Sequence, residues 1–121
     1  MKLKSVMPSI FAAMFAASLF LLQTIPAQSA SHRIEVTAKR FEFAPADVTV
    51  KKGEHVVLAL KSLDVPHGLR IKELGVEAKI AKGQTAEVAF NADKTGTFVG
   101  HCSVFCGAGH GSMTLTVHIV E

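Results

Sequence analysis

Apolar residues recur at every second position along most of the chain after residue 33, and this alternation most strongly limits the possible fold. In residues 113–119 four apolar side chains alternate with two threonines and a histidine, and residues 34–38 show the same pattern. In the expected strand at residues 54–61, Val56, Leu58 and Leu60 fall on one face. A period of two predicts half-buried β-strands, and helical periodicity is missing here. Turn signals at Lys52-Gly53, Lys82-Gly83 and residues 93–96 separate the strands. We therefore predict an all-β sandwich or barrel of about seven to eight strands.

The first thirty residues have a different character. Lys2 and Lys4 precede an apolar run from Ile10 to Leu22, and polar and small residues follow it up to Ala30. This layout is typical of a secretory signal peptide, and the run is shorter than the roughly 20 residues that span a bilayer. We predict a signal peptide or uncleaved anchor in residues 1–30 and one domain in residues 31–121. The predicted location is the periplasm, with membrane attachment only if the anchor is retained.

The charge balance excludes one class of partner. Of thirteen lysines and arginines, Lys2 and Lys4 belong to the export segment, so eleven face ten aspartates and glutamates. A domain with neither a basic stripe nor an aromatic platform is not expected to bind nucleic acid. The sequence also shows no acid–base pair that would support hydrolysis. We predict a monomer that is not itself an enzyme.

The donors for a soft metal are concentrated in one loop. Cys102, Cys106, His110 and Met113 follow the spacing Cys-x3-Cys-x3-His-x2-Met and include both cysteines of the chain. Thiolates, an imidazole and a thioether suit copper. His67, which follows Pro66 at an expected strand start, is the best second imidazole. One cysteine would give a mononuclear type 1 site, whereas two bridging cysteines, with two histidines, the methionine and a backbone carbonyl, would hold two coppers.

Other interpretations remain open for these residues. Cys102 and Cys106 can form a disulfide in an oxidising compartment. With His67 and His110 they can also form a tetrahedral zinc site. Met113 begins an alternating apolar strand and fits a core position.

The remaining histidines and two aromatic residues carry weaker expectations. His101, beside Cys102, can tune the site or take an adventitious metal, and His32 can chelate copper(II) if the chain is cut after Ser29. We expect surface positions for His55 and His118, and core positions for the Phe41 and Phe43 side chains.

The ligand loop resembles the CuA site of cytochrome c oxidase subunit II, a cupredoxin-like domain that recurs in nitrous oxide reductase. Residues 40–53, 62–67 and 93–98 are similar to the first strands, the first ligand segment and the approach to the ligand loop of that family. The resemblance covers about residues 34–120. It implies a Greek-key β-sandwich of the cupredoxin type.

The resemblance also implies a ligand set. Cys102 and Cys106 would bridge two coppers, His67 and Met113 would complete one, and His110 with the carbonyl oxygen of Val104 would complete the other. Val104 stands where subunit II usually has a glutamate that helps a magnesium site. The chain has no Trp or Tyr, whereas oxidase members take electrons through a tryptophan.

These observations lead to a functional hypothesis. We predict a free-standing or tethered periplasmic electron carrier whose partner is a c-type cytochrome or a terminal oxidase. The alternatives are a copper chaperone for oxidase assembly, a mononuclear type 1 cupredoxin and an accessory part of an oxidase complex.

Overall fold

The computed structural model describes residues 31–121, so the predicted signal segment lies outside the described residues. These residues form nine strands: β1 (His32–Lys39), β2 (Glu42–Ala44), β3 (Asp47–Lys51), β4 (His55–Ser62), β5 (His67–Ile71), β6 (Val76–Ile80), β7 (Thr85–Asn91), β8 (Gly96–His101) and β9 (Thr114–Val120). Two short 3-10 helices, η1 (Lys72–Leu74) and η2 (His110–Ser112), interrupt them. No helix in this part of the chain has the length and hydropathy to cross a membrane.

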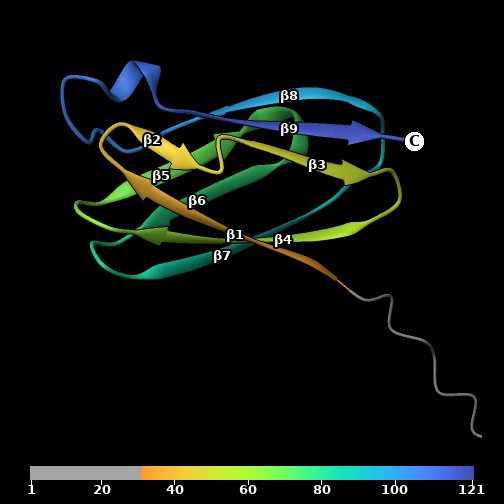
Figure 1. Cartoon of the computed structure of the whole chain (residues 1–121), viewed down its shortest axis with the longest axis horizontal. Helices are drawn as coiled ribbons and strands as arrows, with labels where there is room; N and C mark the ends of the chain where they lie inside the picture. The colour runs from red at the N-terminus through yellow and green to blue at the C-terminus, as the bar shows by residue number, and fades with distance from the viewer. Residues whose placement is uncertain (1–30) are drawn as a thin grey trace, which may run out of the picture.

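The strands form two sheets, which Figure 1 shows as the layers of a sandwich. The four-stranded sheet has the order β2-β1-β4-β7, and the five-stranded sheet has the order β3-β9-β8-β5-β6. The β1–β4 and β3–β9 pairs are parallel, and the other pairs are antiparallel. The predicted all-β sandwich is therefore confirmed.

The core lies between the sheets and is built from the alternating residues. In β9, Leu115, Val117 and Ile119 are buried while the residues between them are partly exposed. The inward side chains of β4 and β5 meet them from both sheets, including fully buried Leu58, Leu60 and Leu69. Burial of these aliphatic side chains stabilises each by about 1.5–3 kcal/mol relative to exposure.

Two details differ from the sequence prediction. The strand count is nine because residues 42–51 divide between the sheets: β2 pairs with β1, whereas β3 pairs with β9. Phe43 is buried as predicted, but the predicted core position of Phe41 is wrong. Phe41 lies in the turn between β1 and β2 and is 36% exposed, because it is outside the alternating pattern of the strands.

The metal-donor residues gather at one end of the sandwich. Three connections meet there: the β1–β2 turn at residues 40–41, the β4–β5 loop at residues 63–66, and the β8–β9 loop at residues 102–113. In Figure 1 the long β8–β9 loop, drawn in blue, lies at the end of the sandwich opposite the C-terminus. We call this end the metal end.

Candidate metal centre

Cys102 and Met113 lie at the two ends of the loop that joins β8 to β9. The amide of Cys102 donates a hydrogen bond to the carbonyl of Met113 at 3.1 Å, which closes the loop at its base. Within the loop, the amides of Ser112 and Met113 bond to the carbonyls of Gly109 and His110 at 3.1 and 3.3 Å. These bonds form η2, and they fix His110 and Met113 relative to the sheet.

Five predicted donor side chains come together at this point. The Sγ atom of Cys102 lies 3.7 Å from Sγ of Cys106 and 3.9 Å from Nδ1 of His67. The Sγ atom of Cys106 lies 3.7 Å from Nδ1 of His110 and 3.9 Å from Sδ of Met113. Each of these donor atoms therefore lies 3.7–3.9 Å from a cysteine sulfur.

The backbone supplies the sixth predicted donor. The carbonyl oxygen of Val104 lies 3.2 Å from Sγ of Cys102, so the loop turns this oxygen toward the sulfur pair. Four of the six donor residues are buried: both cysteines are 4% exposed, and His67 and Met113 are fully buried. The structure thus brings all six predicted donors together, although His67 comes from a strand 35 positions before Cys102.

Asp64 fixes the orientation of the His67 ring. Its Oδ1 lies 2.7 Å from Nε2 of His67, which leaves Nδ1 directed toward the sulfur of Cys102. Burial raises the pKa of Asp64, but hydrogen bonds from the Arg40 amide, His67 and the Val65 amide together outweigh it and lower the pKa to about 2. Asp64 therefore stays a carboxylate, the type of group that commonly holds a metal-binding histidine in one tautomer.

Gly68 allows the ligand loop to lie against β5. A Cβ atom at this position would lie 2.3 Å from Oγ of Ser103, 3.0 Å from Cγ2 of Val104 and 3.1 Å from the carbonyl oxygen of Ala78. A side chain here would push residues 103–104 away from the strand. Because His67 precedes Gly68 directly, this close approach sets the distance between His67 and Cys102.

The β1–β2 turn covers the loop from the other side. The Arg40 side chain donates a hydrogen bond from Nε to the Cys106 carbonyl at 2.9 Å, and its backbone amide donates to Oδ2 of Asp64 at 2.8 Å. The ring of Phe41 packs on the backbone of Gly107 and Gly109, where a Cβ would lie 2.9 and 2.4 Å from ring atoms. Arg40 thus links the segment that carries His67 to the loop that carries Cys106.

The two thiols are free rather than bonded to each other. Their sulfur separation of 3.7 Å is far longer than the roughly 2.05 Å of a disulfide, so the disulfide alternative does not describe this structure. Burial raises the pKa of Cys106 to about 11, and the neighbouring Cys102 adds to this effect. Such a buried thiol resists ionisation in the apo-protein, and it loses its proton when a metal cation binds to the sulfur.

The donor chemistry of the cluster fits copper. Within residues 31–121, the ligand atoms of His67, Cys102 and Cys106 lie within 4.8 Å of one another, an arrangement that could hold a metal ion. A tetrahedral zinc site would use four of the donors and would leave the Met113 thioether without a role. Thiolate and thioether ligands favour copper(I), and imidazole suits both copper oxidation states.

The other histidines lie outside this cluster. His101 is exposed at the end of β8, directly before the buried Cys102. As predicted, His55 and His118 lie on outer faces, where they contact Asn91 and Asp47. The His32 side chain contacts Glu54 at 2.8 Å, and the segment before it lies outside the described residues.

Sequence reasoning missed the residues that hold the ligands in place. Asp64 lies three positions before His67, and that spacing is the one local signal that could have identified it. Arg40 gives no such signal, because its contacts to Asp64 and Cys106 join residues 24 and 66 positions apart.

A β-sandwich that gathers two cysteines, two histidines and a methionine at one end is a soft-metal-binding domain. The chain matches the cupredoxin-like domain family over residues 11–116 and belongs to that family. The cupredoxin assignment made from the ligand loop is therefore confirmed.

Its relatives include oxidase subunits. The chain is 34% identical over 91 residues to cytochrome c oxidase subunit 2 of Cereibacter sphaeroides and spans 30% of that protein's length and 73% of its own. It is 27% identical over 101 residues to the subunit 2 of Thermus thermophilus, covering 84% of this chain and 73% of that one. The crystal structure of the periplasmic domain of oxidase subunit II (CoxB) of Bradyrhizobium japonicum has the same fold, with a TM-score of 0.70 and 22% identity over 78% of this chain and 87% of that one.

Proposed function

We propose that the chain is an exported electron carrier with a binuclear copper centre of the CuA type. The observation that carries the proposal is the contact between the two cysteine sulfurs, each of which also meets one histidine. In this arrangement Cys102 and Cys106 would bridge the coppers. His67 with Met113, and His110 with the Val104 carbonyl, would complete the coordination.

Bound copper would supply a one-electron redox couple. The surrounding protein would limit how far the copper ligands move when an electron is transferred. His67 is held by the Asp64 carboxylate, and Met113 is anchored at the start of β9. The burial of both cysteines, His67 and Met113 limits the access of water to the sulfur pair. Because a close-packed interior resists displacement, these residues favour a small geometric change on electron transfer.

The redox partner that we propose is a c-type cytochrome or a terminal oxidase in the periplasm. The proposal is supported by the relatives, which are oxidase subunits, and by the structural neighbour, which is a periplasmic domain. The chain itself would transform no substrate. It would act as a monomer and reach the membrane only through a retained N-terminal segment.

The deciding experiment is electron paramagnetic resonance of the copper-loaded domain. The proposal predicts hyperfine structure from two equivalent copper nuclei in the mixed-valence state. Splitting from a single copper nucleus would refute the binuclear centre in favour of a type 1 site. A spectrum that is lost on Cys106→Ser but only shifted on Met113→Leu would assign the bridge to the cysteine.

A second candidate function is copper delivery to another protein. It is favoured by an open cavity of about 490 Å³ that reaches Cys102 and would allow a partner's ligand to approach. The two functions differ in a transfer assay with an apo-acceptor site in excess. A delivery protein loses its copper within the assay, whereas an electron carrier retains copper and shows a reversible redox couple.

A further inference from the structure

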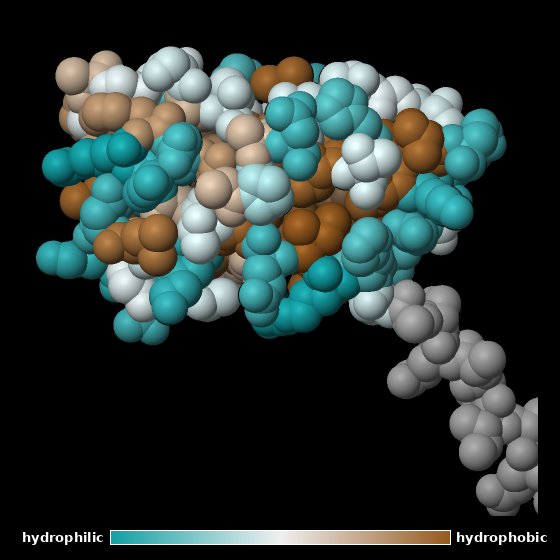
Figure 2. All heavy atoms as spheres, in the orientation of Figure 1, coloured by the Kyte–Doolittle hydropathy of each residue, from teal (hydrophilic) through white to brown (hydrophobic). Residues whose placement is uncertain are grey.

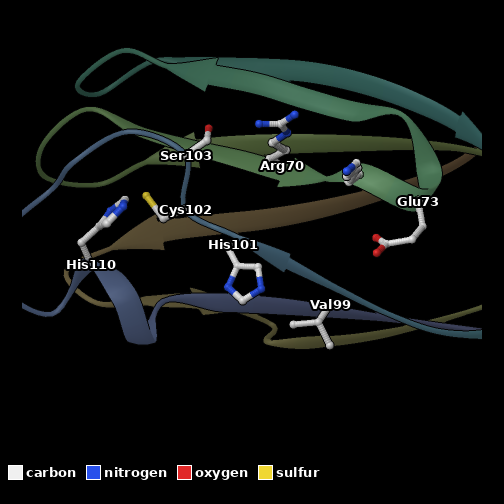
Figure 3. A pocket seen from close by; sticks show the side chains of 8 residues that line it. Arg70, Glu73, Val99, His101, Cys102, Ser103 and His110 are labelled. Atoms are coloured by element: carbon white, nitrogen blue, oxygen red, sulfur yellow. The ribbon is translucent and has the colours of Figure 1, made fainter.

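The cavity beside Cys102 has an unusual combination of lining groups. It lies on the outer side of the five-stranded sheet, where β5 and β8 meet, and Figure 3 shows its side chains. Arg70 and His101 are directly opposed across these two strands. Cys102 lies at one end beside Ser103 and His110, and Glu73 lies at the other end. Lys72, the residue before Glu73, also lines the cavity.

The charge of this cavity is positive. Arg70 and Lys72 supply two permanent cations, and Glu73 is the one acidic residue among the eight that line it. Glu77 faces Arg70 across the β5–β6 pair, but neither Arg70 nor Lys72 has an ion-pair partner among residues 31–121. With Glu73 these three charges sum to one net positive charge, and a cleft with an excess of one sign of charge concentrates ligands of the opposite sign. This cavity therefore attracts anions and repels a bare copper cation.

The approach to the second thiol is different. A separate cavity of about 400 Å³ reaches Cys106, and its lining is mostly apolar: Val65, Pro66, Val104, Phe105 and Gly107. Its one cationic side chain, Arg40, already donates to the Cys106 carbonyl. A charged metal complex would thus meet Cys102 first.

We propose that the cavity lined by Arg70, Lys72 and Cys102 is the loading face of the copper centre, where an anionic copper(I) dithiolate complex docks and transfers its metal. This inference rests on the proposed copper site and adds the route and the chemical class of the donor. A copper(I) ion bound by two thiolates carries one net negative charge, which matches the positive lining.

The transfer is a ligand exchange without a change in oxidation state. The sulfur of Cys102 forms a bond to copper(I), one donor thiolate leaves, and the proton of the Cys102 thiol passes to that leaving sulfur. Cys106, whose sulfur lies 3.7 Å away, repeats the exchange with the second donor thiolate. The balanced result is one copper(I) held by two protein thiolates and two free donor thiols.

The test compares copper(I) complexes of opposite charge as sources of copper for the whole domain. Apo-protein receives copper(I) from the anionic bis-glutathione complex, from a Cys-x-x-Cys peptide complex, or from the cationic acetonitrile complex. Copper on the protein is measured after rapid desalting. Arg70→Glu changes the local charge by two units and should slow uptake from the anionic donors about tenfold at low ionic strength, while it leaves the final copper content unchanged.

The control is Lys51→Glu, which makes the same change of charge at an exposed residue at the far end of β3. It should not alter the rate, and the cationic acetonitrile complex should load the Arg70→Glu protein at least as fast as the wild type. Slowing confined to one anionic donor supports the loading face and identifies a small thiol or a dithiol protein as the source. Equal rates for Arg70→Glu and wild type with both anionic donors overturn the proposal. If the wild type binds no copper from any donor, the copper centre itself is refuted.

Discussion

Gly68 gives a direct test of how the fold positions His67 against Cys102. The substitution Gly68→Ala places a Cβ 3.1 Å from the backbone oxygen of Ala78 and 3.0 Å from Val104, in addition to the 2.3 Å contact with the Ser103 hydroxyl. The Ser103 side chain can rotate. The contact with Val104 is relieved by a shift of the ligand loop, and the contact with the Ala78 backbone oxygen is relieved only by a shift between β5 and β6. Overpacking of this kind costs typically 1–3 kcal/mol.

This strain must appear in the stability of the apo-protein, in copper affinity, or in both. If the loop stays in place, the apo-protein loses the full amount, which corresponds to about 4–8 °C in Tm for each kcal/mol in a domain of this size. If the loop moves away, the donors separate and copper affinity falls, about tenfold for each 1.4 kcal/mol. The summed loss, measured by denaturant unfolding of the apo-protein and by competition for copper(I), should be about 1–3 kcal/mol.

Gly111→Ala is the matched control, since it lies in the ligand loop and a Cβ there meets nothing within 4 Å. The double variant Gly68→Ala/Ser103→Ala should recover only part of the loss, because the contacts with Ala78 and Val104 remain. Equal stability and equal copper affinity for Gly68→Ala and Gly111→Ala would refute the role given to Gly68.

Three further predictions follow from the ligand surroundings. Asp64 has a folded-state pKa of about 2 against an ordinary value of 3.8. Its carboxylate therefore stabilises the fold above about pH 4, and this stabilisation is lost as the pH falls through 2. Asp64→Asn should flatten the fall in apo-protein stability between pH 4 and pH 2 in an acid unfolding experiment. Cys106 has a pKa raised from 9.0 to about 11, so the apo-protein should lose stability as the pH rises from 9 through 11, and an equal loss in Cys106→Ser would show that another group is responsible. Met113→Leu keeps a similar apolar volume and should change apo-protein stability by less than about 1.5 kcal/mol, while it alters the copper spectrum; an unchanged spectrum would mean that the thioether is not a ligand.

The parts of the fold that the sequence predicted are those with a local pattern. The alternation from Met113 to Ile119 predicted β9 and its buried face, and the turn signals at Gly53 and Gly83 match two glycines with positive φ. The ligand loop could also be predicted, because its four donor residues lie within twelve positions of one another.

The remainder depends on contacts between distant segments. No local pattern tells that β2 and β3 join different sheets, or that β1 pairs in parallel with β4. Phe41 was expected in the core because phenylalanine is apolar, but its ring covers the glycines of a loop more than sixty positions away. The charge of the cavity beside Cys102 was equally hidden, since the nearly even balance of charges after residue 30 conceals the local excess around Arg70.

The central claim is that two cysteines 3.7 Å apart turn one copper site into two. The most direct test is the number of copper atoms per chain, determined by metal analysis against quantitative amino-acid analysis after excess copper has been removed. We predict two coppers in the wild type. One copper per chain in the wild type would contradict the account and would favour a mononuclear site.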